Sequence, residues 1–334
     1  MTTPTPELDV VGIGNALVDV LSTTPDETVE RLGLTKGTMD LVDEARMAEV
    51  YRAMGPGIEA SGGSAANTVV GLASLGGRAH YIGRVRDDQL GDVFVHDINA
   101  TGVGYSNPAA GDGPATGCCL VLVTPDAQRT MNTFLGASAL LGPDDLDADV
   151  IRSAQVTYLE GYLFDQPEAQ SAFREAAAIA HESGRRVALT LSDLFCVERH
   201  REAFRELVDH HVDILFANTV EILALYEVDE FDDAVAEVRR HCPLAVLTRS
   251  ELGAAVVTPD EVVEVPAHPV DEVVDTTGAG DLFAAGFLFG WTRGKSMATS
   301  ARLGALAAAE VISHLGPRPA VSLAELAAPL MSRP

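Results

Sequence analysis

The chain of 334 residues predicts an α/β fold in which a mostly parallel central sheet is covered by helices on both faces. Short apolar segments of strand composition recur along the chain. Segments with apolar residues at three- and four-residue spacing, typical of helices, lie between several of them. Apolar residues make up 47% of the chain and charged residues 22%, which indicates a globular protein with a substantial core.

The expected elements follow one another in a regular order. Strands are expected at residues 10–13, 79–85, 156–159, 187–191, 213–216 and 244–247, and helices at 65–75, 170–182, 197–209 and 232–241. Gly76, Gly184 and Pro243 close three of these helices. Residues 35–42 and 116–135 break this alternation, and within the second segment residues 119–123 and 130–135 have strand composition around a turn. We expect these two segments to form a small antiparallel flap outside the main sheet.

The composition excludes several classes of function. Forty-nine acidic residues against 23 Lys and Arg give a formal net charge of -26, which repels nucleic acid and anionic lipid. No apolar run reaches the roughly 18 residues of a membrane-spanning helix, and the N-terminus lacks the order of a secretory signal, so we expect a cytoplasmic protein. The four cysteines form no CxxC pair, which predicts reduced thiols and no structural metal. An anionic substrate would need local donors or a cation to overcome this charge.

A glycine-rich turn at residues 275–281 carries the strongest chemical signal. Thr277 is a good helix N-cap, and the small residues Gly278, Ala279 and Gly280 leave backbone N–H groups uncovered at the start of a helix. Such a helix end binds anions, including the oxygens of a phosphoryl group in transfer. Asp281, one turn in, is placed to accept a proton from an attacking hydroxyl, and we expect its surroundings to keep it ionised. Tight packing and an ordinary first-turn carboxylate would explain the same residues.

A second glycine-rich segment precedes the helix expected at 65–75. Gly62 and Gly63 would let the backbone approach a ligand closely, and Asn67 offers both a donor and an acceptor to hydroxyl groups. An ordinary loop followed by a helix with an exposed Asn explains this segment equally well.

Together, the sequences DTTGAGDLFAAGFL and GGSAANTVVGLASLGG resemble the two signatures of the ribokinase-like, or PfkB, family of carbohydrate and nucleoside kinases. The resemblance covers roughly the whole chain. It implies a single ribokinase-like domain over residues 1–334, with a small β lid contributed by about 15–45 and 104–137. It also implies transfer of the γ-phosphoryl group of ATP to an alcohol.

The resemblance assigns roles on the acceptor side of the site. Asp281 becomes the catalytic base, and Asp19 the carboxylate that holds sugar hydroxyls. The remaining residues carried over are Gly278, Ala279 and Gly280 as the anion hole, and Gly62, Gly63 and Asn67 as substrate-binding residues.

On the nucleotide side, Asn218 and Glu221 match the NxxE motif of the family, which implies that Glu221 organises Mg²⁺ through water. The same pair would form a helix capping box, and both roles are compatible. Thr248 and Gly253 match the segment near ATP, although Ser250 stands where many relatives have glycine. The resemblance also places Thr277 at the nucleotide and, with Asp275, near a monovalent cation such as K⁺.

Three features resemble the adenosine kinase-like members of the family. Arg129 matches the lid arginine that approaches the transferred phosphate, and Tyr162 stands where an aromatic ring can stack on a purine. Leu-Ser-Asp at 191–193 is similar to the adenosine kinase sequence at that strand end. These features imply phosphorylation of adenosine to AMP, with a ribose, fructose or related keto-sugar kinase as the alternative. A non-catalytic ligand-binding regulator on the same fold is the alternative of another class, and either a monomer or a homodimer fits the chain.

Overall fold

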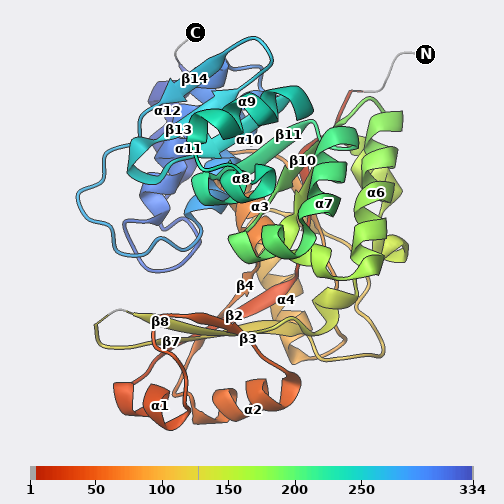
Figure 1. The fold of residues 1–334 in the computed structure, drawn as a ribbon. Helices are drawn as coiled ribbons and strands as arrows, with labels where there is room; N and C mark the ends of the chain where they lie inside the picture. The colour runs from red at the N-terminus through yellow and green to blue at the C-terminus, as the bar shows by residue number, and fades with distance from the viewer. Residues whose placement is uncertain (1–4, 127, 333–334) are drawn as a thin grey trace.

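A nine-stranded sheet forms the centre of the protein in the computed structural model, which describes residues 5–126 and 128–332. Its strand order is β14-β13-β12-β11-β10-β9-β1-β5-β6, parallel from β12 to β6 and antiparallel at β13 and β14 (Figure 1). The strands are β1 (Leu8–Ile13), β5 (Ala79–Ile82), β6 (Gly104–Tyr105), β9 (Ala154–Glu160), β10 (Arg186–Thr190), β11 (Ile214–Asn218), β12 (Leu244–Thr248), β13 (Ala254–Val257) and β14 (Val262–Val265).

Helices cover both faces of this sheet, and the alternation of side chains along the strands supplies a core to each. Val10 and Tyr81 pack into one core, whereas Val11 and Ile82, their chain neighbours, pack into the other. One face carries α3 (Ser64–Ser74), α4 (Gln89–Ala100), α10 (Ala279–Thr292), α11 (Met297–Val311) and α12 (Leu323–Met331). The other carries α5 (Ala148–Ser153), α6 (Pro167–Glu182), α7 (Leu194–His210), α8 (Thr219–Tyr226) and α9 (Phe231–His241).

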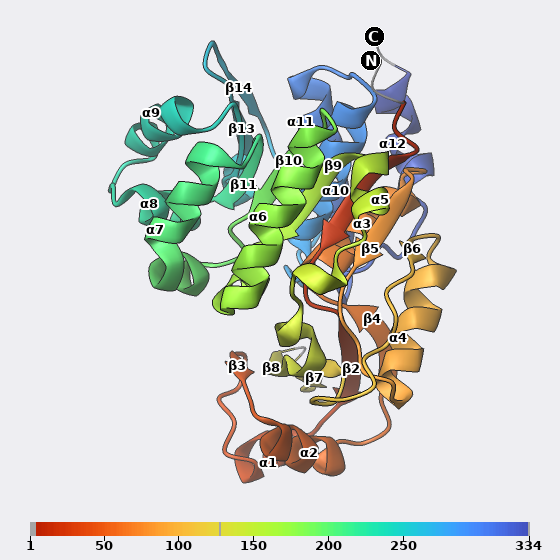
Figure 2. The same ribbon diagram turned by 90° about the vertical axis from the view of Figure 1, so that its right-hand side faces the viewer.

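A separate small sheet has the strand order β3-β8-β7-β2-β4, and α1 (Asp26–Arg31) and α2 (Glu44–Ala53) lie on its far side (Figures 1 and 2). Its strands are β2 (Leu17–Thr23), β3 (Met39–Leu41), β4 (Ile58–Gly62), β7 (Gly117–Val123) and β8 (Arg129–Phe134). The expected flap was purely antiparallel, but β2 pairs with β7 and β3 with β8 in parallel. The helices α1 and α2 lie between β2 and β4 in the chain and close the outer face.

The α/β architecture predicted from the alternating pattern is confirmed, and each of the six predicted strands and four predicted helices has a counterpart. Two details lie outside the expectation. β4 comes from residues 58–62, beyond the segments assigned to a lid, and its sequence IEASG has few strand-forming residues. β6, inside the 104–137 segment, belongs to the large sheet instead. Over the described ranges, no helix has both the length and the apolar character needed to span a membrane.

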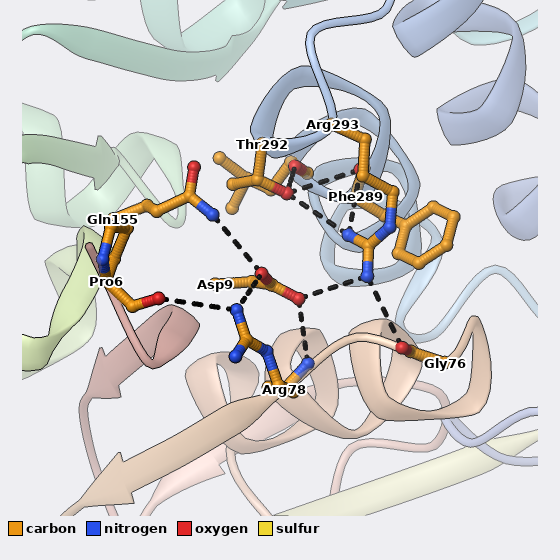
Figure 3. Close-up of polar contacts among 9 residues, drawn as sticks. Pro6, Asp9, Gly76, Arg78, Gln155, Phe289, Thr292 and Arg293 are labelled. Atoms are coloured by element: carbon orange, nitrogen blue, oxygen red, sulfur yellow. Dashed lines mark hydrogen bonds and ion pairs between the residues drawn. The ribbon is translucent and has the colours of Figure 1, made fainter.

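The edge of the large sheet where β1 begins is fixed by the buried carboxylate of Asp9 (Figure 3). Arg78 donates to it from its backbone N–H at 2.9 Å and from Nη2 at 3.4 Å. Arg293, just after α10, donates to Oδ2 at 3.1 Å, and Gln155 of β9 donates to Oδ1 at 3.3 Å. One carboxylate thereby joins the starts of neighbouring strands to the end of α10. Because the strands are parallel, this edge is opposite to the one where β1, β9, β10 and β11 end.

Candidate active site

A cavity of about 1370 Å³ lies where the ends of the parallel strands face the small sheet. Both glycine-rich segments reach it, although they are separated by more than 200 residues in the sequence. Of the residues predicted for the site, Gly62 and Asp275 are outside the cavity lining. The others line it: Asp19, Gly63, Asn67, Arg129, Tyr162, Asn218, Glu221, Thr248, Gly253, Thr277, Gly278, Ala279, Gly280 and Asp281.

The start of α10 differs from the expected cap. Gly278, not Thr277, is the N-cap residue, with a left-handed φ of 79°. Thr277 donates instead to one carboxylate oxygen of Asp275, from its N–H at 3.0 Å and from its hydroxyl at 2.7 Å. The N–H of Ala279 donates to Thr276 O at 3.2 Å, so it is not a bare amide as expected. Gly280 remains open: its N–H has no partner among the described residues, and an added Cβ would meet nothing within 4 Å.

Asp281 occupies the third position of α10 and is held by α3. Ser64 Oγ donates to its Oδ1 at 2.6 Å and Asn67 Nδ2 to its Oδ2 at 3.0 Å. Burial raises the pKa of Asp281 to about 6, against the opposing effects of these hydrogen bonds and of Arg318. The surroundings therefore make Asp281 harder to ionise than a free aspartate, because desolvation outweighs the donors. Asp281 is nevertheless mostly ionised at neutral pH, and a base with a pKa near 6 can both accept and release a proton.

Asp19 reaches the same cavity from β2 of the small sheet. Its carboxylate lies against Gly62, where an added Cβ would stand 2.5 Å from it. Gly63 has a φ of 102°, and a Cβ there would lie 2.2 Å from the backbone oxygen of Asn15. The two glycines thus allow the chain to pack against Asp19 and Asn15. Burial also raises the pKa of Asp19 to about 6, while Arg318 and Arg129 act in the opposite direction.

Glu160 is a buried cavity residue that the sequence analysis missed. It ends β9 and accepts hydrogen bonds from the N–H and Nδ2 of Asn15, at 3.2 and 2.9 Å, and from Ala65 N at 2.7 Å. Burial raises its pKa to about 7, because desolvation exceeds the effect of these donors. Its signal in the sequence is an acidic residue directly after the apolar strand expected at 156–159.

Arg129 connects the small sheet to the turn before α10. Its Nη1 lies 2.6 Å from Asp275 Oδ2 and 3.2 Å from Thr277 Oγ1. Its Nε and Nη2 are buried without a hydrogen-bond partner among the residues described. Asp275 also accepts the N–H of Gly316 at 2.9 Å, so each of its oxygens already receives two donors. This carboxylate does not fit the direct binding of a monovalent cation, because its acceptor positions are filled and a guanidinium balances its charge.

The nucleotide-side residues lie at the ends of β11 and β12. Asn218 and Glu221 form the capping box of α8, with Glu221 N donating to Asn218 Oδ1 at 2.9 Å and Asn218 N to Glu221 Oε2 at 3.0 Å. Burial raises the pKa of Glu221 to about 7. Since both of its oxygens accept hydrogen bonds from Asn218, Glu221 fits a cation held through water better than one bound directly. Ser250, where relatives have glycine, adopts a left-handed φ of 51°.

Several large apolar side chains also line the cavity. Tyr162, held by its N–H on Ser192 Oγ at 3.1 Å, lines it from the large sheet. Met39 and Leu41 of β3 and Phe195 of α7 line it as well, and they are 41%, 55% and 65% exposed. The sequence analysis did not find these last three residues. Large apolar side chains so exposed around a cavity are typical of a ligand site.

The family model described as "pfkB family carbohydrate kinase" matches residues 29–323, most of the chain. The chain belongs to this family. Its members are phosphotransferases that act on a hydroxyl group, use ATP and generally require Mg²⁺. This kinase is 52% identical to the solved adenosine kinase from Sinorhizobium meliloti, with a TM-score of 0.89 and coverage of 97% of this chain and 99% of that chain.

Two further relatives carry different names. A probable sugar kinase from Rhizobium etli CFN 42 is 48% identical, with a TM-score of 0.90 and coverage of 98% of this chain and 100% of that chain. The adenosine kinase of Saccharomyces cerevisiae is 28% identical over 330 residues, covering 92% of this chain and 96% of that protein. The predicted family and fold are thereby confirmed, and the identity of the acceptor is not decided by these names.

Proposed function

We propose that this kinase transfers the γ-phosphoryl group of ATP to the 5′-hydroxyl of a nucleoside, with adenosine preferred and AMP as the product. The observation that supports a nucleoside is the set of large apolar side chains, Tyr162, Met39, Leu41 and Phe195, that line the same cavity as Asp19. A purine needs an apolar, planar environment, whereas a free sugar needs mainly hydroxyl partners. The 52% identical relative named adenosine kinase supports the same choice.

In this proposal, Asp19 accepts hydrogen bonds from the ribose hydroxyls and Asp281 takes the proton of the attacking 5′-hydroxyl. The open N–H of Gly280 and the positive end of the α10 dipole stabilise charge on the transferred phosphoryl oxygens. Arg129 donates to the same charge from Nε and Nη2, the two guanidinium nitrogens that have no hydrogen-bond partner among the described residues. Mg²⁺, bound with the triphosphate, supplies positive charge to the phosphates, and Glu221 holds its waters. The small sheet acts as the lid of a single catalytic domain spanning the chain.

A sugar kinase is the second candidate, and the buried carboxylate of Glu160 supports it. Glu160 and Asn15 add polar side chains to the cavity, and in this second candidate they form hydrogen bonds with sugar hydroxyls. The 48% identical probable sugar kinase points the same way. We place either reaction in the cytoplasm, because the described cysteines are all free and ATP is the donor.

The test is ADP release from Mg-ATP across a panel of nucleosides and sugars. We expect kcat/KM for adenosine to exceed that of ribose or fructose by at least about 100-fold, the discrimination that buried contacts with a base provide. Higher kcat/KM for a sugar would contradict the proposal. Binding without turnover of any acceptor would favour a non-catalytic regulator.

The variant Phe195→Ala tests whether the apolar side chains of the cavity bind the base of a nucleoside. It should raise KM for adenosine by about tenfold, as expected for a lost apolar contact, while KM for ATP stays unchanged. Leu315→Ala is the matched control, because Leu315 is also exposed, at 49%, but does not line the cavity.

A further inference from the structure

The loop between α11 and α12 lies against the turn that leads into α10 and is fixed there at two points. The N–H of Gly316 donates to Asp275 Oδ2 at 2.9 Å. Pro317 packs so closely on Gly278 that a Cβ on Gly278 would lie 2.9 Å from Pro317 Cα. These contacts hold the next residue, Arg318, next to the start of α10.

Arg318 is anchored to the small sheet on its other side. Its Nη2 donates to the backbone oxygen of Ser61 at 2.6 Å and to Ser61 Oγ at 3.2 Å. Ser61 is fixed in turn by Asp97, which accepts its N–H at 2.7 Å and its hydroxyl at 2.6 Å. The Nε and Nη1 atoms of Arg318 are buried and have no hydrogen-bond partner in the described parts of the chain. The acceptors of Arg318 in these hydrogen bonds are neutral, so its positive charge is free to act on carboxylates farther away.

The charged and titratable groups that act on Arg318 come from four elements. They are Asp19 of β2, Asp97 of α4, Asp281 of α10 and Tyr81 of β5. Arg129 also acts on Asp19, but Asp275 neutralises it at 2.6 Å.

The other acidic groups near Asp281 oppose its ionisation, so a nearby positive charge has a larger effect there. Glu160 of β9 is a further buried carboxylate that interacts with Asp281, as does the Tyr158 hydroxyl, and Ser64 and Asn67 are its neutral donors. Asp19 and Asp281 also interact unfavourably with each other.

We propose that Arg318 is a positioning residue that keeps Asp19 and Asp281 ionised together, although it lies outside the cavity and touches neither substrate. Removal of a charge from water favours the neutral form of a carboxyl, and two neighbouring carboxylates oppose each other's ionisation. The guanidinium of Arg318 favours the ionised form of Asp19 and of Asp281, and it therefore opposes both the desolvation and the mutual repulsion. The kinetic part of this inference rests on the proposed role of Asp281 as the base, whereas the electrostatic part does not.

The electrostatic part is tested without ATP or turnover. Carboxyl carbons of ¹³C-labelled aspartate are titrated by NMR in the intact wild-type, Arg318→Met and Arg318→Lys proteins, with Asp19→Asn and Asp281→Asn used for assignment. In the wild type, both groups should titrate with a pKa of about 6. In Arg318→Met, both titrations should move upward by about one unit or more, and in Arg318→Lys by much less. Unmoved titrations in a folded Arg318→Met protein would overturn the proposal.

The kinetic part is tested by the pH profile of kcat/KM for the best acceptor. In Arg318→Met, the acidic limb should move upward with the NMR titrations, so that activity falls by about tenfold more near pH 6 than near pH 8. A merely structural role would lower activity equally at every pH. Arg302→Met is the matched control, because Arg302 is exposed on α11 and the substitution changes the net charge equally.

The two experiments separate the possible failures. If the NMR titrations move but the pH profile does not, Arg318 acts on the carboxylates and Asp281 is not the base. If neither moves, the inference about Arg318 is wrong and the proposed function stands. Should Arg318→Met not fold, as judged by its thermal transition, Arg318→Gln replaces it, because its amide can keep the hydrogen bond to Ser61 without the charge.

Discussion

At the scale of single residues, the site brings together buried carboxyl groups whose ionised form is disfavoured by their removal from water. Asp19, Glu160, Glu221 and Asp281 all line one cavity, and burial raises the pKa of each. Such groups are typical of functional sites, because a protein selected for stability alone would not keep them. The guanidinium groups of Arg318 and Arg129, from other segments of the chain, offset part of this desolvation at Asp19.

Asp281→Asn tests the base directly. We expect kcat to fall by at least about 100-fold with little change in adenosine binding, because an amide keeps the shape of the side chain but accepts no proton. Steady-state kinetics and equilibrium binding of adenosine provide the two readouts. A variant with nearly wild-type kcat would remove Asp281 from the mechanism.

The same variant should be more stable than the wild type at alkaline pH. The pKa of Asp281 in the folded protein, about 6, is above the 3.8 of the free side chain. The stabilisation from the protonated form is therefore complete below about pH 4 and is lost as the pH rises through 6. We expect Asp281→Asn to raise stability at pH 8 by on the order of 1 kcal/mol, and by less at pH 5. Thermal unfolding at both pH values measures this, and an equal change at both would show that the charge is not responsible.

At the scale of elements, α10 combines two requirements in adjacent glycines. Gly278 needs its left-handed φ and its contact with Pro317 to start the helix, whereas Gly280 faces open space. The first glycine of the GAG sequence therefore serves the fold, whereas the last is free to serve the ligand in the proposed function.

A matched pair of substitutions separates these requirements. Gly278→Ala should destabilise the protein by about 2 kcal/mol or more, since it adds both backbone strain and a clash with Pro317. Gly280→Ala should leave the thermal transition unchanged but lower kcat/KM for ATP by at least about tenfold, because its methyl group occupies the approach to the phosphoryl group. Equal loss of stability in both variants would contradict the separation.

Element prediction succeeded where local signals were strong. The glycine turns that lead into α3 and α10 could be recognised because the turn glycines and the apolar periodicity are local features. β4 was not predicted, because its five residues are held by pairing with β2 and not by strand propensity. The cap of α10 was assigned to Thr277 because a sequence does not show that Asp275 competes for its hydroxyl.

At the scale of the whole molecule, α10 connects two polar centres at opposite edges of the sheet. It begins at the open amide of Gly280 and ends next to Arg293, which bonds to Asp9 (Figure 3). Asp9 binds the starts of β5 and β9 as well, so the far edge fixes the helix whose first turn forms part of the candidate site.

Asp9→Asn should therefore act on stability and not on the chemistry. We expect a loss of about 2 kcal/mol, because the amide nitrogen of Asn cannot accept the hydrogen bonds that the buried carboxylate receives, with KM for ATP and for the acceptor unchanged. Chemical denaturation and steady-state kinetics provide the two measurements. Asp149→Asn is the control, since its side chain is 95% exposed. A change in KM without a change in stability would contradict this role of the far edge.

The amino-acid sequence by itself determined the family, the parallel sheet, the two glycine-rich turns and fourteen of the residues that line the cavity, because these depend on local periodicity and on short motifs. Only the tertiary structure revealed that Glu160 and exposed apolar side chains line the cavity and that Arg318 acts on Asp19 and Asp281. The direction of the pKa shifts also came from the structure alone. Arg318 and Ser61 are 257 positions apart in the chain. The ionisation of a carboxyl depends on burial and on charges carried by distant segments, and neither quantity exists until the chain has folded.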